Sequence, residues 1–243
     1  MFGYARAGGG KYEPDVDELR EMFAMLPSLL DRLRAWHRGR LDAIIMNPAR
    51  QLVSDSGLIL FHVVPLSALG LGGHKVSAAD ISAHVDGLRP HRAVGLSWQV
   101  NFDGFLVWSE GYNGAVGYAQ AYRNGIIEMV ARGAVVYDSK SNENIIFSAN
   151  FEAEIVKSSL SYVKSQLGLG FKFPVAICIT LNGVLGARVD RGFWHEVPVI
   201  KENTITFDEI ILEDVPTDGK GMAQQLKPIF DQLANAGGRP KST

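Results

Sequence analysis

Residues 97–110 read SWQVNFDGFLVWSE, two runs of alternating polar and apolar side chains on either side of Asp103-Gly104. Asp-Gly is a preferred dipeptide for a two-residue type I′ hairpin turn. A turn centred there pairs Phe102 with Phe105 and Val100 with Val107, so one face of the hairpin is almost wholly apolar and the other is mixed. The stretch therefore predicts an antiparallel sheet with one face on a core.

The hairpin signal recurs further along the chain. Asn124-Gly125 predicts a second hairpin, in which Tyr122 faces Ile127. Asn182-Gly183 predicts a third, between strands at 175–181 and 184–189. Additional strands are expected at 57–66, 193–200 and 206–212.

Helical spacing of apolar residues surrounds these strands. Pro27 separates two expected N-terminal helices, and Gly168 and Pro228 mark the end of a central helix and a kink in a C-terminal one. The order predicts an α+β fold, with an antiparallel sheet built from hairpins and with N-terminal, central and C-terminal helices. The expected helices span 16–26, 28–45, 150–167 and 221–236, with a short one near 77–80.

Composition sets limits on the class of protein. The chain has 243 residues, of which 47% are hydrophobic and 21% charged, close to the averages of globular proteins. No apolar run approaches the roughly 18 residues of a membrane span, so no membrane partner is expected. The single cysteine, Cys178, favours a cytoplasmic setting, and the net charge of −2 predicts no strong general attraction to phosphate backbones.

The motifs of common catalytic and cofactor sites are incomplete. A phosphate-binding loop at Gly8-Gly9-Gly10-Lys11 would need a glycine in place of Ala5 and a serine or threonine in place of Tyr12. The six histidines are scattered with no i, i+4 pair, and Cys178 lies in an apolar strand. We therefore predict no catalytic residue, no cofactor site and no metal site.

One basic cluster could contact nucleic acid. Arg32, Arg34, Arg38 and Arg40 surround Trp36 on a predicted helix, and arginines interleaved with an aromatic ring are typical of such interfaces. Against this, the first fifty residues hold 8 Lys/Arg and 7 Asp/Glu, which is nearly neutral. A solvated helix face is the alternative interpretation.

Three further residues are candidates for interaction or for chemistry. Across the predicted Asn124-Gly125 turn, Arg123 and Glu128 are diagonal neighbours within reach of each other. His62 lies inside an apolar strand, where it is either a core histidine or a working base. The three together form a hydrolase or transferase site only if they meet in one pocket. Otherwise Arg123 and Glu128 are a surface ion pair.

Several landmarks resemble one family. They resemble the region that follows the AlbA-like domain in bacterial Schlafen AlbA-type proteins, which are described as ATP-binding or divergent AAA-type. The resemblance implies that residues 1–12 are the remnant of an AlbA-like domain, that 13–50 form a helical segment packing on the main domain, and that 51–243 are an α+β domain. The landmarks are Arg6 with the glycines, DELREMF (17–23), LFHVVPL (60–66), NFDG (101–104), YRNGIIE (122–128), the strands of 174–185 and the closing segment 230–237.

The resemblance also bears on function. It implies that the part of the relatives that binds DNA or nucleotide lies outside this chain, and it transfers no catalytic residue to this region. We expect a non-catalytic accessory domain that acts as an interaction or sensing module, with a protein partner or a small ligand. The alternatives are nucleic-acid binding through the Arg32–Arg40 helix face, and hydrolase or transferase chemistry near His62, Arg123 and Glu128.

Overall fold

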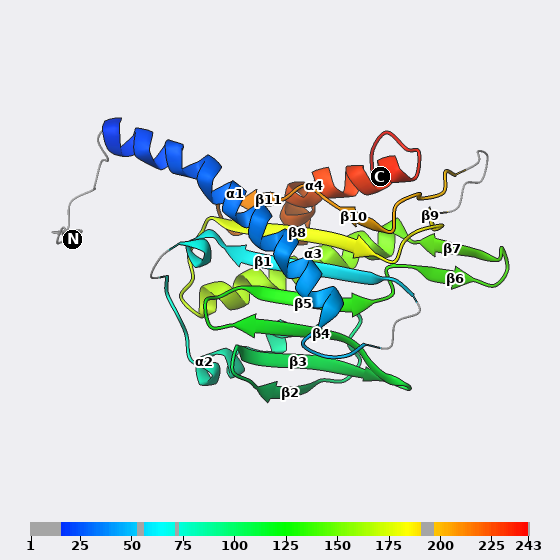
Figure 1. Cartoon of the computed structure of the whole chain (residues 1–243), viewed down its shortest axis with the longest axis horizontal. Helices are drawn as coiled ribbons and strands as arrows, with labels where there is room; N and C mark the ends of the chain where they lie inside the picture. The colour runs from blue at the N-terminus through cyan, green and yellow to red at the C-terminus, as the bar shows by residue number, and fades with distance from the viewer. Residues whose placement is uncertain (1–15, 53–55, 71–72, 191–196, 243) are drawn as a thin grey trace.

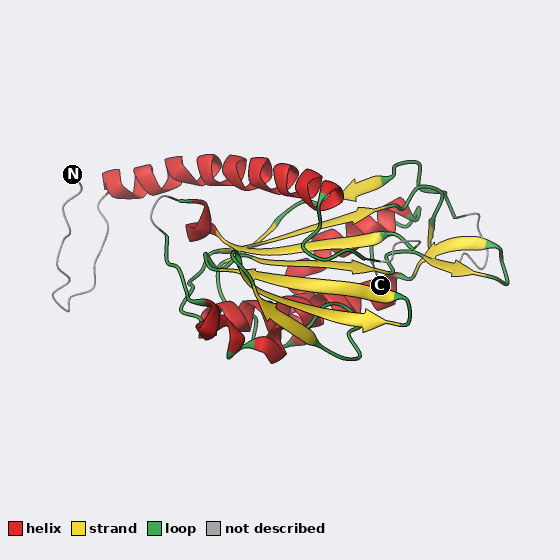
Figure 2. Ribbon diagram, turned by 60° about the horizontal axis from the view of Figure 1, so that its bottom comes forward, coloured by secondary structure: helices red, strands yellow, loops and turns green. Residues whose placement is uncertain are grey.

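The computed structural model describes residues 16–52, 56–70, 73–190 and 197–242, with side chains from residue 29 onward. An antiparallel sheet lies between helix α1 (Val16–Met46) on one face and helices α3 (Ser148–Gly168) and α4 (Gly219–Ala236) on the other (Figures 1 and 2). The predicted α+β architecture is confirmed.

The strands of the main sheet follow the order β10-β8-β1-β5-β4-β3-β2, and each neighbouring pair is antiparallel. A smaller sheet joins β6 (Val136–Asp138), β7 (Glu143–Ile146) and β9 (Arg188–Val189). The bounds of the main strands are β1 Leu58–Pro65, β2 Ser97–Val100, β3 Gly104–Gly111, β4 Gly114–Tyr122, β5 Ile127–Arg132, β8 Val175–Asn182, β10 Thr204–Thr206 and β11 Ile210–Leu212, which also pairs with β8.

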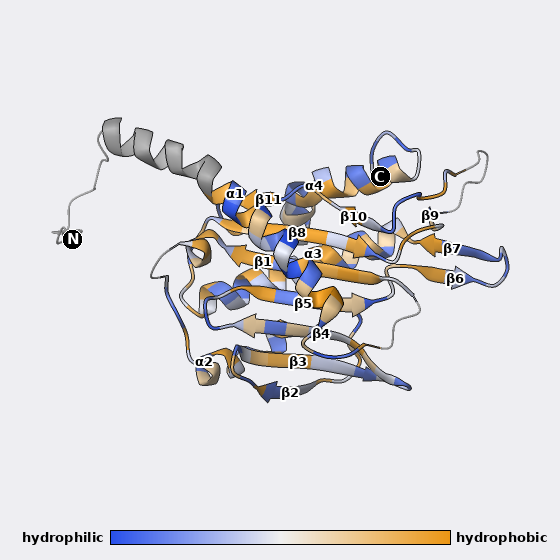
Figure 3. Cartoon of the chain, in the orientation of Figure 1, coloured by the Kyte–Doolittle hydropathy of each residue, from blue (hydrophilic) through white to orange (hydrophobic). Residues whose placement is uncertain are grey.

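Both faces of the sheet are covered, as the alternate side chains of strand β1 show. Ile59, Phe61 and Val63 pack into the core shared with α3 and α4, while Leu60 and Val64 pack in the clusters that contain residues of α1. A strand buried on both faces reads as a continuous apolar run. Figure 3 shows the resulting apolar band along the central strands. His62 occupies the α1-facing row of this strand.

The predicted N-terminal helix pair is wrong, because α1 is one helix that continues through Pro27. A proline removes one backbone hydrogen bond, and the turns on both sides can continue. Pro228 likewise lies inside α4, where Met222, Leu226 and Ile229 are fully buried and hold the helix on the core. The short helix α2 (Ala78–Ser82) begins with the capping box of Ser77 and Asp80.

The first hairpin turns one residue earlier than predicted. The backbones of Asn101 and Gly104 exchange hydrogen bonds of 3.0 and 3.3 Å, so residues 102–103 form the turn and Val100 faces Phe105. The side chain of Asn101 accepts a further hydrogen bond from the Gly104 N–H at 2.8 Å. This side-chain contact stabilises the observed turn over the Asp103-Gly104 turn.

The second hairpin is also shifted, and the shift matters for the site. The Tyr122 N–H donates to the Ile126 carbonyl, so the loop has three residues and Gln120, not Arg123, lies beside Glu128. Gln166 of α3 donates to the Gly125 carbonyl at 2.7 Å, and this tertiary contact supports the longer loop. A register shift of one residue exchanges the faces of a strand.

The third predicted hairpin does not form. Strand β8 has β1 on one side and β10 and β11 on the other, so the segment 184–189 finds no free edge there. Only Arg188–Val189 is extended, and it pairs in parallel with β7. The predicted strand at 206–212 is interrupted, since β10 and β11 flank residues 207–209. Much of the strand predicted at 193–200 lies outside the described residues.

Two glycine substitutions should move stability in opposite directions. Gly125 has φ of +88°, and a Cβ there would lie 2.5 Å from the Phe171 ring, so we expect Gly125→Ala to lower the free energy of unfolding by about 1–3 kcal/mol. Gly39 lies within α1, and no atom lies within 4 Å of the place that an added methyl group would occupy, so Gly39→Ala should raise it by roughly 0.5–1 kcal/mol. Urea unfolding of the two variants measures both changes in the free energy of unfolding. Equal changes would contradict the observed loop.

Candidate functional site

Polar side chains gather at the interface between α1 and the sheet. Leu33, Leu41 and Ile44 place one face of α1 on the sheet, and His37 and Arg40 lie on the same side of the helix. Opposite them the sheet presents Glu128, whose cross-strand neighbours are His62 on β1 and Gln120 on β4. Buried polar groups at an apolar interface need partners, and these partners define the site.

The Glu128 carboxylate is fully buried and is surrounded by hydrogen-bond donors. Arg40 binds it through two nitrogens, with Nε 2.5 Å from Oε2 and Nη2 3.0 Å from Oε1. The Tyr118 hydroxyl donates to Oε1 at 3.2 Å, and His62 Nε2 lies 3.3 Å from Oε2. Arg40 Nη2 also donates to the Tyr122 hydroxyl at 2.7 Å. This is a two-nitrogen arginine–carboxylate pair supported by residues of two strands, β1 and β4.

These contacts keep the ion pair charged. Burial alone would raise the pKa of Glu128, but the hydrogen bonds from His62 and Arg40 lower that pKa to about 2. The hydrogen bond to Glu128 raises the pKa of Arg40 further above its usual value. Burial, followed by the Glu128 charge, raises the pKa of Tyr118 and Tyr122, which therefore stay protonated donors. Glu128 is an anion whose acceptor positions are occupied.

Two buried histidines, His37 of α1 and His62 of β1, lie next to each other beside the ion pair. The His62 and His37 ring centroids are 5.2 Å apart, and Trp36 packs edge-on against His62 at the same distance. Burial, followed by the neighbouring His62, lowers the pKa of His37 to about 4. His37 is therefore neutral near pH 7. Among the described residues, neither His37 Nε2 nor His62 Nδ1 has a hydrogen-bond partner.

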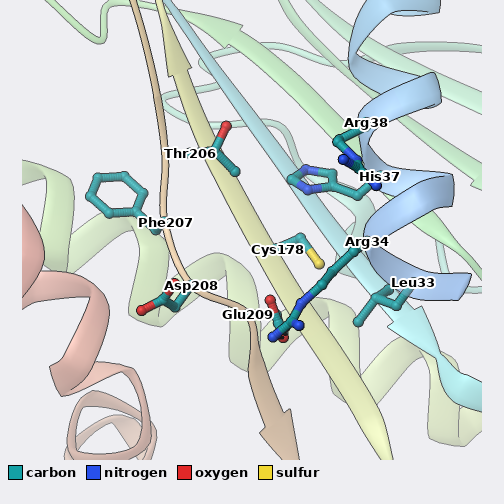
Figure 4. A pocket seen from close by; sticks show the side chains of 9 residues that line it. All are labelled: Leu33, Arg34, His37, Arg38, Cys178, Thr206, Phe207, Asp208 and Glu209. Atoms are coloured by element: carbon teal, nitrogen blue, oxygen red, sulfur yellow. Dashed lines mark hydrogen bonds and ion pairs between the residues drawn. The ribbon is translucent and has the colours of Figure 1, made fainter. Parts of the chain in front are cut away.

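A cavity of about 280 Å³ opens beside His37, between α1 and the segment that joins β10 to β11 (Figure 4). The His37 ring extends from the helix toward β8, and Arg34 reaches across to Glu209. Arg34 donates to Glu209 Oε1 from Nε at 2.9 Å and from Nη2 at 2.5 Å. The cavity is lined by Leu33, Arg34, His37, Arg38, Cys178, Thr206, Phe207, Asp208 and Glu209.

The lining of the cavity is mixed in charge and polarity. Its charged lining residues are two arginines and two carboxylates, one of each being joined as the Arg34–Glu209 pair. Burial raises the pKa of the Cys178 thiol to about 12, so this sulfur is protonated and is a poor nucleophile. The His37 ring is neutral, and its Nε2 is buried without a hydrogen-bond partner among the described residues.

The predicted basic helix face is divided by the structure. Successive residues turn by about 100° around a helix, so residues two apart point in nearly opposite directions. Arg40 turns toward Glu128, Arg34 pairs with Glu209, and Arg38 lines the cavity on the Arg34 side. Arg32 is exposed. The four arginines therefore do not form one continuous surface.

The other three candidates are separated in part. His62 and Glu128 are brought together, whereas Arg123 lies at the β4–β5 turn and donates from Nε to the Phe102 carbonyl at 3.3 Å. Arg40 holds the place beside Glu128 that the sequence assigned to Arg123. Sequence reasoning missed Arg40 as this partner, and it missed Tyr118, Tyr122 and His37. In the observed register the two tyrosines, four apart on β4, share the face of Glu128, whereas the predicted register, with Tyr122 facing Ile127, placed them on the opposite face.

Removing Arg40 should be far more damaging than removing Arg34. Arg40→Met leaves the buried Glu128 carboxylate without its cation, and we expect the free energy of unfolding to fall by about 3 kcal/mol or more. Arg34→Met on the same helix breaks a pair whose arginine is largely exposed, and its effect should be much smaller. Denaturant unfolding of both variants tests this. Equal losses would mean that the Arg40 pair does not hold the helix.

Stability should fall as the solution is acidified. The pKa of His37 is about 4 in the folded chain against 6.5 unfolded, so the unfolded chain binds the extra proton and the free energy of unfolding decreases as pH falls through this window. His91 behaves alike, because burial lowers its pKa to about 4. Each contributes at most about 1.4 kcal/mol per pH unit. Below about pH 4.5 the Glu128 contribution is lost as well.

A His37→Gln variant separates the contribution of His37 from the rest of the pH dependence of stability. Between pH 6.5 and 4.5 its slope of stability against pH should be about half that of the parent chain, because His91 still titrates. The measurement is a series of urea titrations at fixed pH steps. An unchanged slope would mean that His37 is already solvated in the folded chain.

Within the described part of the chain, no helix has the length and apolarity to cross a membrane, and no group of three histidine, cysteine or acidic side chains could hold a metal ion. No protein-family model matches the sequence, and no curated protein or solved structure is significantly similar to it. The resemblance to the Schlafen AlbA-type family therefore stays a prediction.

Proposed function

We propose that this chain is a non-catalytic interaction or sensing module in which helix α1 is the responsive element. The observation that carries the proposal is the state of the buried cluster: Glu128 is charged and fully hydrogen-bonded, and His37 is neutral. Such a cluster joins a helix to a sheet. We further propose that the module belongs to a Schlafen AlbA-like bacterial protein whose DNA- or nucleotide-binding part lies elsewhere.

The geometry does not favour a hydrolase or transferase. A general base needs a free acceptor within reach of a substrate proton, and the Glu128 oxygens already accept from Arg40, Tyr118 and His62. Both His62 and Glu128 are completely shielded from solvent. Arg123 does not lie beside them, because it donates to the Phe102 carbonyl at the β4–β5 turn. The three residues that this alternative requires therefore do not meet in one pocket.

The position of α1 supports a responsive role. Its C-terminal half packs on the sheet through two small apolar clusters that are separate from the main core. Its N-terminal half extends beyond the edge of the sheet (Figure 1). The cavity beside His37 is lined by α1 on one side and by residues 206–209 on the other. A ligand in that cavity, or a partner on the extended half, would change how α1 sits on the sheet.

Hydrogen exchange should detect α1 opening as a separate unit. We expect peptides from 29–46 to exchange faster than peptides from α3, because less apolar surface holds α1 in place. Glu128→Gln should speed exchange in 29–46 and leave α3 and α4 unchanged, while Glu209→Gln, at a more exposed pair, serves as the matched control. Exchange of α1 only together with the core would contradict a responsive helix.

Turnover and nucleic-acid binding test the two alternatives directly. If the purified chain hydrolyses ATP or nucleic acid at all, we expect a His62→Ala variant to hydrolyse it equally well. If the chain binds DNA or RNA, we expect that the binding is not salt-sensitive and that an Arg32→Ala/Arg38→Ala variant does not weaken it. Turnover that disappears in a folded His62→Ala variant would overturn the proposal. Steeply salt-dependent binding lost in the double variant would establish the nucleic-acid alternative instead.

A further inference from the structure

A second cavity, of about 410 Å³, lies at the end of strand β5, where the main sheet meets the smaller one. Its walls come from the residue before β1, the turn at 90–93, the end of β5, one residue of β4, and the strands β6 and β7. Figure 1 shows β6 and β7 projecting beyond the ends of the main strands. None of the described lining residues belongs to α1, so this cavity is separate from the one beside His37. Its volume falls in the range of about 300–1,000 Å³ that is typical of small-molecule sites.

The described lining of this cavity is positively charged. Arg92 and Arg132 both line it, and no carboxylate does so among the residues that the structure describes. The Glu154 carboxylate of α3 lies against His91 instead, with 3.7 Å between Oε2 and Nδ1. Two guanidinium groups at one recess favour an anion as its occupant.

Arg92 is held at the cavity by its backbone. Its φ of +54° lies in the left-handed region, which residues with a side chain adopt rarely. The turn that contains it is fixed on α3, because the Tyr162 hydroxyl donates to the Arg89 carbonyl at 2.7 Å, and His91 is buried. The guanidinium lies over Gly133, with Nη1 3.9 Å from the place that a Cβ would occupy there. An uncommon backbone conformation thus positions an exposed cation at the end of β5.

Neutral polar groups complete the lining. The Ser56 hydroxyl is shielded from solvent and has no hydrogen-bond partner among the described residues. A buried hydroxyl without a partner is costly, and a ligand oxygen is the acceptor that it lacks. Asn144 adds a side-chain amide. Tyr137 is 60% exposed and its hydroxyl donates to Asn142, so it presents the face of its ring to the occupant.

We propose that this cavity binds the phosphate group of a small phosphorylated molecule. A phosphate monoester carries a charge of about −1.5 to −2 near pH 7, which two arginines can balance. The fork of donors on each guanidinium also matches pairs of phosphate oxygens. The remaining volume takes the organic part of the ligand, against the Tyr137 ring.

The charge of the whole chain favours a small molecule over a nucleic acid. The net charge is −2, so the protein as a whole has no general attraction for a long polyanion, and the positive charge is confined to one recess. The site uses no residue of α1. It therefore stands independently of the responsive helix proposed above.

Isothermal titration calorimetry with phenyl phosphate, benzoate and inorganic phosphate tests the class of ligand. At constant ionic strength we expect phenyl phosphate to bind at one site, about tenfold or more tighter than benzoate, because its second negative charge meets the second arginine. It should also bind more tightly than inorganic phosphate, which has no ring to pack on Tyr137. Absence of saturable phenyl phosphate binding, or equally tight binding of benzoate, would overturn the proposal. Equally tight binding of inorganic phosphate would overturn the assignment of an organic part.

Two variants test the place of binding. Arg92→Gln should weaken phenyl phosphate binding about tenfold or more, because it removes charge-assisted hydrogen bonds to the phosphate. Arg89→Gln, which changes an exposed arginine outside the cavity lining three residues earlier, should leave the Kd unchanged. Arg92 is exposed, so the folded state should survive its replacement, and circular dichroism checks this. Equal Kd values for Arg92→Gln and the parent chain would overturn the site.

A third variant tests the role of the aromatic ring. Tyr137→Ser should remove the preference for phenyl phosphate over inorganic phosphate while both still bind, since the arginines remain. The same calorimetric titrations measure this. A preference that survives in Tyr137→Ser would overturn the placement of the organic part.

Discussion

The ion pair between Arg40 and Glu128 is the constraint on which the α1 face of the molecule depends. A carboxylate with no exposure to solvent is tolerated only when its oxygens are bonded to donors. Those donors come from α1, β1 and β4, while β5 carries the carboxylate itself. One charged group therefore requires a helix and three strands to hold a single relative position.

The same interface limits the chemistry that Glu128 and His37 can perform. The donors that stabilise Glu128 occupy the positions that a substrate proton would need, and the surroundings that bury His37 keep it neutral. What remains available lies to one side, in the cavity between α1 and residues 206–209. Residues 207–209, which separate β10 from β11 along β8, line one side of that cavity.

The two margins of the sheet differ in what covers them. Near β8, strands β10 and β11 and helix α1 cover the margin, and the cavity lies between them. At β2 the margin is uncovered and its apolar side chains are exposed. The cavity and the uncovered strand therefore lie at opposite ends of the strand order.

The sequence by itself determined the class of fold. The alternation around residues 97–110, the apolar run of β1 and the helical spacing of α3 and α4 are local patterns, and local patterns report which side of an element is buried. They did not determine register. In both hairpins an asparagine-containing turn had several possible lengths, and side chains such as Asn101 and Gln166 selected one.

Only the tertiary structure decided the site. Arg40 and Glu128 are 88 residues apart, and they meet because α1 crosses the sheet at one particular angle and depth. The sequence placed Glu128 beside Arg123, whereas the one-residue shift of the hairpin turned Glu128 toward α1 instead. Burial of a charge and the choice of its partner depend on how whole elements pack, and that packing is summed over many weak contacts that no short stretch of sequence contains.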